Sequence, residues 1–373
     1  MKNFPGRSRL FVIILTLLVF LLVMVPFTKS SKSAGRSVGG DISYAKISTD
    51  RTYRTVHPGE SFSMNVTCRS SRNHPEPDLR FKSSDESVAS VSDAGEIQAD
   101  KAGTAVITCT SQDGQKLRLK LFVRKVPKKV VYLTYDDGPG THNTPKLLKV
   151  LDKYDAKATF FIVGTQAKGN EKIIRQELES GHAVGIHTYT HDYNKIYKSS
   201  NAYMKDFDRT ADMLQKISGQ RAYFVRMPGG SNNGYVRTKT ARKIIRDLHD
   251  RGYTVMDWTA GSDDAVGIEY GTRALTRFAI TTSRGEKVKV ILMHDSDAKP
   301  HTAAVTRNVI RYYKKRGYSF ESLENYTGGD ILFLDTPDSG RKKEAKSNAE
   351  SESLAKRAAM LSALGIIGQP DSE

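Results

Sequence analysis

The chain has 373 residues, enough for two folded domains, since single domains cluster near roughly 100–200 residues. Lys and Arg number 58 against 41 Asp and Glu, which gives a formal net charge of +17. That charge favours anionic partners such as acidic lipid or an acidic cell-wall polymer. Nucleic acid is a weaker candidate, because the basic residues are spread along the chain and show neither zinc-finger spacing nor a basic helix with heptads.

The N-terminus predicts attachment to a membrane. Residues 1–9 contain three basic residues, and residues 10–27 contain no charge. At about 1.5 Å per residue, this stretch nearly crosses a hydrocarbon core of roughly 30 Å. We expect a single transmembrane anchor with residues 1–9 in the cytosol, the remainder extracellular, and residues 28–44 as a Ser- and Gly-rich linker. A cleaved signal peptide, and hence a secreted protein, stays open as the alternative, because residues 31–34 (SKSA) resemble a weak cleavage site.

Residues 45–124 predict a small all-β sandwich. Short runs alternate apolar and polar residues, and turn residues separate them. Cys68 and Cys109 each end such a run, and outside the cytosol they are candidates for a disulfide across the sandwich. Residues 81–91 (FKSSDESVASV), followed by Gly103, resemble the bacterial Ig-like repeats of surface proteins. That resemblance implies a spacer or a wall-binding module.

Residues 125–335 predict an α/β domain. Apolar runs alternate with helical stretches such as residues 144–154 and 238–251. This order favours an incomplete, seven-stranded (β/α) barrel with a parallel sheet. The expected strands are 129–135, 158–163, 183–187, 222–226, 253–258, 288–294 and 317–320. The polar residues 336–373 are expected to be mostly disordered.

Residues able to do chemistry fall at the ends of these predicted strands. Asp136 and Asp137 end the first strand, and His187 and His191 end the third. Barrel active sites lie at that face of the sheet. One carboxylate and two imidazoles form a three-ligand set that leaves a zinc position open for water. The second carboxylate is then available as a base toward that water. Further strand ends carry Arg226, Asp257 and His294.

Five motifs in this region resemble those of the polysaccharide deacetylase (NodB-homology) family, carbohydrate esterases that remove acetyl groups from amino sugars. They occur in the family's order within residues 129–325. They are YDDGP at 135–139, with Tyr where Phe is more usual, HTYTH at 187–191, RMPGG at 226–230, DW at 257–258 and LMH at 292–294. Gly229 stands where the family often carries Tyr, so an aromatic wall of the substrate groove is expected to be lost.

The resemblance implies a role for each motif residue. The metal ligands would be Asp137, His187 and His191. The catalytic residues would be Asp136 as general base, His294 as general acid, Arg226 orienting Asp136, and Asp257 pairing with His294. The substrate contacts would be Trp258, Leu292, Gly229 and Tyr135. One divalent metal is expected, zinc first, although Co²⁺, Mn²⁺ and Ni²⁺ suit the same ligands.

These features predict a metal-dependent hydrolase that removes N-acetyl groups from cell-wall polysaccharide, with N-acetylglucosamine of peptidoglycan as the leading substrate. N-acetylmuramic acid, poly-N-acetylglucosamine, chitin oligomers and acetyl xylan stay open as substrates, and so does a wall-binding pseudoenzyme. A glycoside hydrolase with Asp136 and Asp137 as paired acids is disfavoured, because adjacent strand residues point to opposite faces. No obligate protein partner is expected.

Overall fold

The computed structural model describes residues 46–69, 77–125, 127–265 and 270–334. The predicted cytosolic segment, membrane span, linker and polar tail (residues 1–9, 10–27, 28–44 and 336–373) lie outside these ranges. Within the described ranges, no helix is both long enough and apolar enough to cross a membrane.

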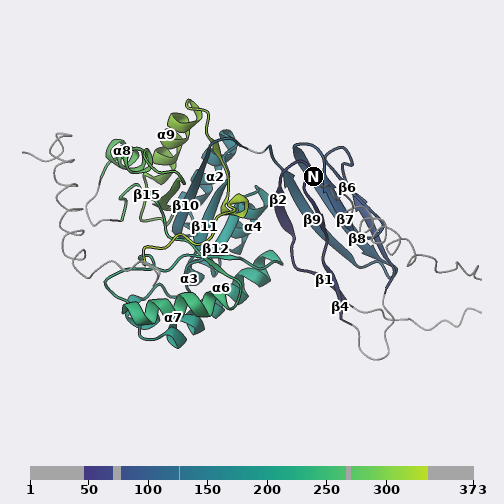
Figure 1. Ribbon diagram of the computed structural model, residues 1–373, viewed down its shortest axis with the longest axis horizontal. Coiled ribbons are helices and arrows are strands. Elements are labelled where there is room, and N and C mark those ends of the chain that lie inside the picture. Colours follow the sequence, from purple (N-terminus) through teal and green to yellow (C-terminus); the bar gives the residue numbers. More distant parts are fainter. Residues whose placement is uncertain (1–45, 70–76, 126, 266–269, 335–373) are drawn as a thin grey trace, which may run out of the picture. The chain divides into compact units, whose positions relative to one another are not determined.

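The first described region is an all-β domain, as the alternating pattern predicts (Figure 1). Its strands are β1 (Lys46–Thr49), β2 (Tyr53–Val56), β3 (Ser61–Ser63), β4 (Val66–Arg69), β5 (Leu79–Ser83), β6 (Ala89–Val91), β7 (Glu96–Ala99), β8 (Gly103–Ser111) and β9 (Lys116–Val123). They form a four-stranded sheet in the order β2-β9-β8-β5, a three-stranded sheet β3-β7-β6 and the pair β1-β4. Alternate residues of β8 and β9, such as Ile107 and Leu121, are buried in one core, because successive strand residues point to opposite faces.

The predicted disulfide is not present, since Cys68 and Cys109 are both free thiols. Cys109 is fully buried on the core side of β8, whereas the half-buried Cys68 belongs to the separate β1-β4 pair. Burial raises the pKa of the Cys109 thiol, and the neighbouring Cys68 adds to the increase. Cys109 therefore remains protonated and packs as a small apolar side chain.

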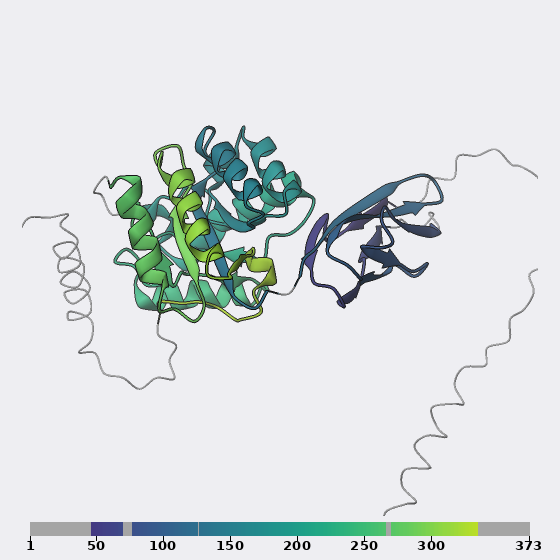
Figure 2. The ribbon, with the colours of Figure 1, turned by 90° about the horizontal axis from the view of Figure 1, so that it is seen from above.

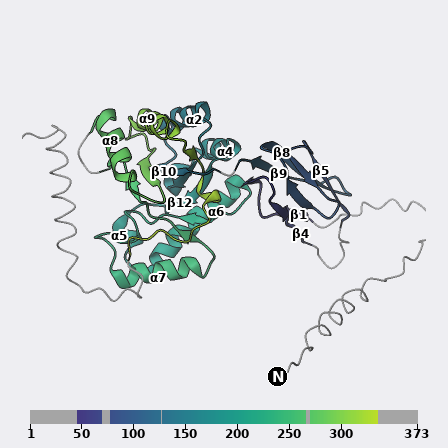
Figure 3. The same ribbon diagram turned by 45° about the horizontal axis from the view of Figure 1, so that its top comes forward.

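The second region is a parallel sheet with helices on its outer side (Figure 3). Its strands are β10 (Val130–Gly138), β11 (Ala158–Ile162), β12 (Ala183–Ile186), β13 (Phe224–Val225), β14 (Thr254–Val255), β15 (Ala260–Gly261), β16 (Val290–His294) and β17 (Ser319–Phe320). The order is β14-β13-β12-β11-β10-β16-β15, with β17 beside the start of β10. The end strands β14 and β15 do not pair with each other, so the barrel is incomplete as predicted. All seven predicted strands are present, and β15 is an addition.

The helices pack on the outer face of this sheet. They are α2 (Asn143–Lys153), α3 (Gly164–Ala167), α4 (Glu171–Glu179), α5 (Tyr193–Ile196), α6 (Ser200–Ser218), α7 (Thr238–His249), α8 (Thr272–Ser283) and α9 (Thr302–Lys314), followed by the 3₁₀ helix η1 (Leu323–Asn325). Figure 2 shows α8 and α9 side by side. In β10, Leu133 and Tyr135 belong to the core beneath the helices. The alternate residues Thr134 and Asp136 therefore face the inside of the barrel.

The segment after η1 lies along the edge of β14. Ile331 forms a parallel bridge with Met256, and its N–H donates to the Val255 carbonyl at 3.2 Å. The Ile331 carbonyl accepts from Asp257 N–H at 2.7 Å, and the Asp330 carboxylate accepts from Val255 N–H at 2.7 Å. These bonds satisfy backbone groups that an edge strand otherwise leaves unpaired.

Candidate metal and catalytic site

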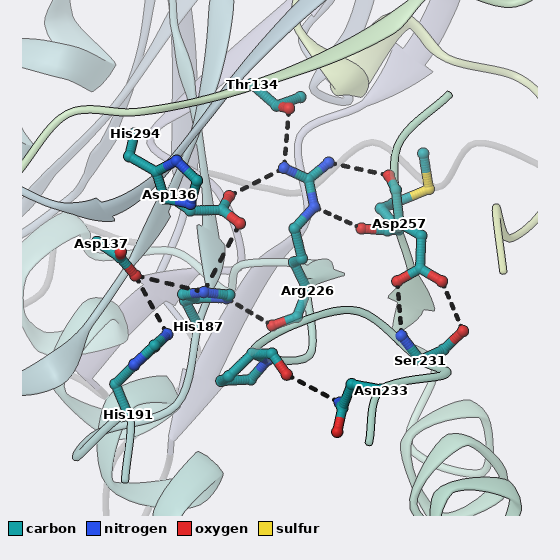
Figure 4. Close-up of polar contacts among 12 residues, drawn as sticks. Thr134, Asp136, Asp137, His187, His191, Arg226, Ser231, Asn233, Asp257 and His294 are labelled. Carbon is teal, nitrogen blue, oxygen red and sulfur yellow. Dashed lines mark hydrogen bonds and ion pairs between the residues drawn. The ribbon is translucent and has the colours of Figure 1, made fainter. Parts of the chain in front are cut away.

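The two adjacent acids lie on the same side of β10, contrary to the expectation of opposite faces. Asp137 has a left-handed φ of 70°, and the register with β11 shifts between Asp136 and Gly138. Such a bulge redirects the side chain that follows it. As a result, Asp136 Oδ2 and Asp137 Oδ1 each lie 3.6 Å from His187 Nε2. The site therefore contains both carboxylates, as Figure 4 shows.

The residues Asp137, His187 and His191 fit a divalent metal. One ligand atom from each lies within 4.8 Å of the others, and Asp137 Oδ1 is 3.2 Å from His191 Nε2. Asp137 Oδ1 is buried and has no hydrogen-bond partner, which is costly unless a cation faces it. His187 Nδ1 donates to the Arg226 carbonyl at 2.7 Å, so its Nε2 lone pair is left for a metal.

The protonation state of His187 suits the same role. Burial, reinforced by the neighbouring His191, lowers the pKa of His187 to about 3. The ring is therefore neutral near pH 7, which is the form that binds metals.

The predicted base Asp136 is held by Arg226, as the resemblance implies. Arg226 is fully buried, and its Nη1 donates to Asp136 Oδ1 at 2.9 Å and to Thr134 Oγ1 at 2.8 Å. Its other N–H groups donate to two backbone carbonyls, so the guanidinium is fixed on every side. Burial raises the pKa of Asp136, while the charges of Arg226 and His294 oppose that rise. The carboxylate is thus ionisable and oriented at the same time.

The partner of His294 is Asp264, not Asp257 as predicted. His294 Nδ1 donates to Asp264 Oδ1 at 2.8 Å, and the backbone N–H of His294 donates to Asp264 Oδ2 at 2.9 Å. Burial alone would lower the pKa of His294, but the hydrogen bond and charge of Asp264, with Asp136 and Asp137, raise it to about 9. His294 is therefore a cationic acid near neutral pH.

Asp257 follows β14, several strands away from β16 in the sheet, and its carboxylate has other partners. Its carboxylate is fully buried and accepts from Ser231 N–H at 2.9 Å, from the Ser231 hydroxyl at 2.5 Å and from Phe333 N–H at 2.6 Å. It therefore joins the RMPGG loop to the last described segment of the chain. Its backbone carbonyl also accepts from Arg226 Nη2 at 3.0 Å, and this bond links it to the predicted catalytic residues Arg226 and Asp136.

Tyr135 is not a substrate contact, contrary to the prediction. It is fully buried and stacks on Phe160 with ring centroids 5.2 Å apart. Its hydroxyl lies 2.9 Å from Thr306 Oγ1 on α9. The strand pleat explains the error, because the residue before Asp136 must point to the helix side of the sheet.

The other predicted substrate contacts lie around the site. Leu292 precedes His294 by two residues in β16, so both share the inner face with Asp136, which is directly opposite His294 in register. Trp258 is half-buried, with its ring 5.7 Å from the Arg226 guanidinium. Gly229 adopts a left-handed φ of 74° in the RMPGG loop. The assignments of these three residues as substrate contacts remain predictions.

The sequence does not reveal Asp264 as a site residue, because it does not reveal β15. This strand has only two residues, Ala260 and Gly261, and pairs in parallel with β16. Asp264 follows β15, just as His294 ends β16, so the pairing brings the two side chains together. A carboxylate a few residues past an edge strand is the one signal that could have pointed to it.

Comparisons with known proteins agree with this site. Residues 123–248 match the polysaccharide deacetylase family, and residues 44–121 match the bacterial Ig-like domain (group 2). A peptidoglycan-N-acetylglucosamine deacetylase of Bacillus cereus is 32% identical over 210 residues, which cover 55% of this chain and 73% of that protein. The putative polysaccharide deacetylase YheN of Bacillus subtilis is 34% identical over 200 residues, 53% of this chain and 68% of the relative.

Among solved structures, the catalytic domain of peptidoglycan N-acetylglucosamine deacetylase from Eubacterium rectale has a TM-score of 0.52 and 31% identity, covering 56% of this chain and 94% of that chain. The half-barrel and its Asp–His–His ligand set define a metal-dependent hydrolase. The chain belongs to the polysaccharide deacetylase family and carries a bacterial Ig-like domain before its catalytic domain.

Proposed function

We propose that this chain removes N-acetyl groups from cell-wall glycan and that its substrate is the N-acetylglucosamine of peptidoglycan. The observation that carries the proposal is the pairing of an Arg-held carboxylate, Asp136, with an Asp-held imidazole, His294, beside one Asp–His–His ligand set. The glycan is supported by the similarity to peptidoglycan-N-acetylglucosamine deacetylases of Bacillus cereus and Eubacterium rectale.

The residues divide the chemistry of amide hydrolysis between them. A zinc ion held by Asp137, His187 and His191 would supply a Lewis acid for the acetyl carbonyl and for the attacking water. Asp136 would accept the proton that this water loses. Arg226 aims the carboxylate through a hydrogen bond, and its charge favours the ionised form against the effect of burial. The backbone N–H of Gly229 would help to hold the oxyanion that forms.

His294 would complete the reaction by protonating the departing nitrogen. An amine leaves readily only after it gains a proton, since its anion is very basic. The carboxylate of Asp264 keeps His294 charged up to its pKa of about 9, so the acid is available where Asp136 is ionised. Base and acid lie on neighbouring strands, with Asp136 and His294 opposite each other in register.

The remaining parts of the chain suit work at the cell wall. We place residues 10–27 in the membrane, with the catalytic domain on the outer side. The Ig-like domain then serves as a spacer between the membrane and the glycan, and the net charge of +17 favours an acidic wall.

The test is release of free amine from purified, N-acetylated peptidoglycan by the full chain loaded with zinc. We expect amine release that a chelator abolishes and that Asp136→Asn also abolishes. Asp93→Asn, at an exposed position of the Ig-like domain, makes the same charge change and should leave the rate unaltered. Activity on chitin oligomers or acetyl xylan without activity on peptidoglycan would overturn the substrate. Binding to the wall without any activity would favour the pseudoenzyme.

A further inference from the structure

Two tyrosines stand beside the metal ligands without a part in the mechanism. Tyr193, the first residue of α5, lies edge-on to the His191 ring, with centroids 5.3 Å apart at 87°. Tyr235, from the loop after the RMPGG motif, lies against Tyr193 with centroids 4.5 Å apart at 49°. The pair thus extends from a metal ligand toward solvent.

Local structure fixes Tyr193 in this position. His191 has a left-handed φ of 54°, which turns the chain directly after the metal ligand. The Asp192 carboxylate then caps α5 by accepting from Asn194 N–H at 3.1 Å and Lys195 N–H at 3.4 Å. An N-cap of this kind fixes where a helix begins, so the ring of the first helical residue is presented toward His191.

Tyr235 is also held, although its side chain is 67% exposed. Asn233 Oδ1 accepts from Tyr235 N–H at 2.9 Å, and Asn233 Nδ2 donates to the carbonyls of Pro228 at 3.1 Å and Gly230 at 2.8 Å. The hydrogen bonds of Asn233 therefore order this turn, which exposes the Tyr235 ring next to Tyr193. The exposed ring of Tyr235 lies against the half-buried ring of Tyr193, so the two form one aromatic surface.

Gly229 lies directly against the ring of Tyr193. A Cβ added to Gly229 would lie 3.2 Å from both Cε1 and Oη of Tyr193. The phenol of Tyr193 thus occupies the space beside the loop into which a side chain at position 229 would project. Gly229 is required both by its φ of 74° and by this ring.

We propose that Tyr193 and Tyr235 form the aromatic wall of the glycan-binding groove and stack on the sugar next to the one that loses its acetyl group. The ligand class is a β-linked polymer of N-acetylated hexosamine, because aromatic rings pack on the C–H faces of pyranoses while a phenol can also bond their hydroxyl groups. The inference rests on the proposed function for the identity of the glycan.

The test measures binding apart from turnover. The parent protein is the zinc-loaded full chain carrying Asp136→Asn, which is titrated calorimetrically with N-acetylglucosamine pentamer. The same titration is done with three further proteins that each carry one more substitution, Tyr193→Ala, Tyr193→Phe or Tyr235→Ala. We expect Kd to rise about tenfold for Tyr193→Ala and about threefold for Tyr235→Ala, because each variant removes a ring that packs on the sugar. Tyr193→Phe, which keeps the ring, should weaken binding about threefold or less. Tyr312→Ala, at a half-buried tyrosine of α9, is the matched control.

Zinc affinity distinguishes a role in binding the sugar from a role in supporting the metal ligand His191. If the two tyrosines contact the sugar, all variants bind zinc as the parent does. A loss of zinc affinity in Tyr193→Ala that matches its loss of glycan binding would show that Tyr193 only braces His191 and would overturn the proposal. Alanine variants that bind the pentamer as the parent does, or a parent that binds no pentamer, would overturn it as well. Pentamer binding by the parent, without amine release by the wild-type chain, would overturn the proposed function and leave the wall standing.

Discussion

The substitution Asp264→Asn tests whether Asp264 keeps the proposed general acid, His294, protonated. Asp264 uses one oxygen for the His294 ring and the other for the His294 backbone, and the side chains of Asp264 and His294 are nearly buried, with 8% and 12% exposed. The ordinary pKa of a histidine is about 6.5, and the pKa of His294 is raised to about 9. At about 1.4 kcal/mol per pKa unit, the difference corresponds to about 3 kcal/mol in favour of the cation.

Asparagine keeps the shape of Asp264 but removes its charge, so we expect the pKa of His294 to fall to about 6.5 or below. Because the protonated His294 is the proposed acid, activity is present below the pKa of His294 and is lost as the pH rises through it. At pH 8 the parent ring is mostly charged, whereas about one variant ring in thirty is charged at a pKa of 6.5. We therefore expect kcat/KM at pH 8 to fall about thirtyfold, and most of that loss to disappear at pH 6.

The assay is the pH profile of amine release from an N-acetylglucosamine oligomer, with zinc bound. Asp263→Asn, which makes the same charge change at the preceding residue, is the matched control and should move the alkaline limb much less. Equal zinc affinity and equal thermal midpoints would exclude a folding effect. An alkaline limb near pH 9 in Asp264→Asn, or a loss that is the same at pH 6 and pH 8, would refute the assigned role of Asp264.

Further predictions concern the metal with its ligand His191 and the side chains of Asp136, Asp257 and Tyr135. A chelator should abolish activity and added zinc restore it, whereas His191→Ala should require far more zinc, as titration of the apo protein would show. Asp136→Asn should lower kcat by at least about 10²-fold while zinc still binds, and a near-normal kcat would exclude Asp136 as base. Asp257→Ala should lower the free energy of unfolding by about 2–4 kcal/mol, because the buried donors of Ser231 and Phe333 lose their acceptor, and an unchanged denaturation midpoint would contradict this. Tyr135→Phe should cost about 1 kcal/mol of stability and leave KM unchanged, whereas a raised KM would return Tyr135 to the substrate groove.

Much of the catalytic fold follows from local sequence, because buried parallel strands appear as short, nearly continuous apolar runs. The run before Asp136 and the run before His187 are examples, and both strands are present. β15 has two residues and offers no such run. The predicted disulfide is absent even though its two cysteines lie in different sheets, as a bridge across a sandwich requires. The ends of alternating strands therefore do not suffice to predict the bond.

In the candidate site, too, residues that belong to local motifs can be predicted, whereas contacts that depend on the order of the strands cannot. The metal ligands can be predicted because each belongs to a compact motif at a strand end. The partner of His294 cannot, because sheet order decides it: Asp257 follows one edge strand, and Asp264 follows the strand beside His294. The aromatic ring next to Gly229 belongs to Tyr193, in another segment of the chain, so it cannot be predicted from position 229 alone.

Mass spectrometry of muropeptides tests the proposed reaction most directly, with N-acetylated peptidoglycan treated by the zinc-loaded full chain and then digested. We predict the loss of acetyl groups from N-acetylglucosamine and their retention on N-acetylmuramic acid, with no loss from either sugar when Asp136→Asn replaces the wild-type chain. Muropeptides that keep every acetyl group, or that lose them from N-acetylmuramic acid alone, would contradict the proposed function.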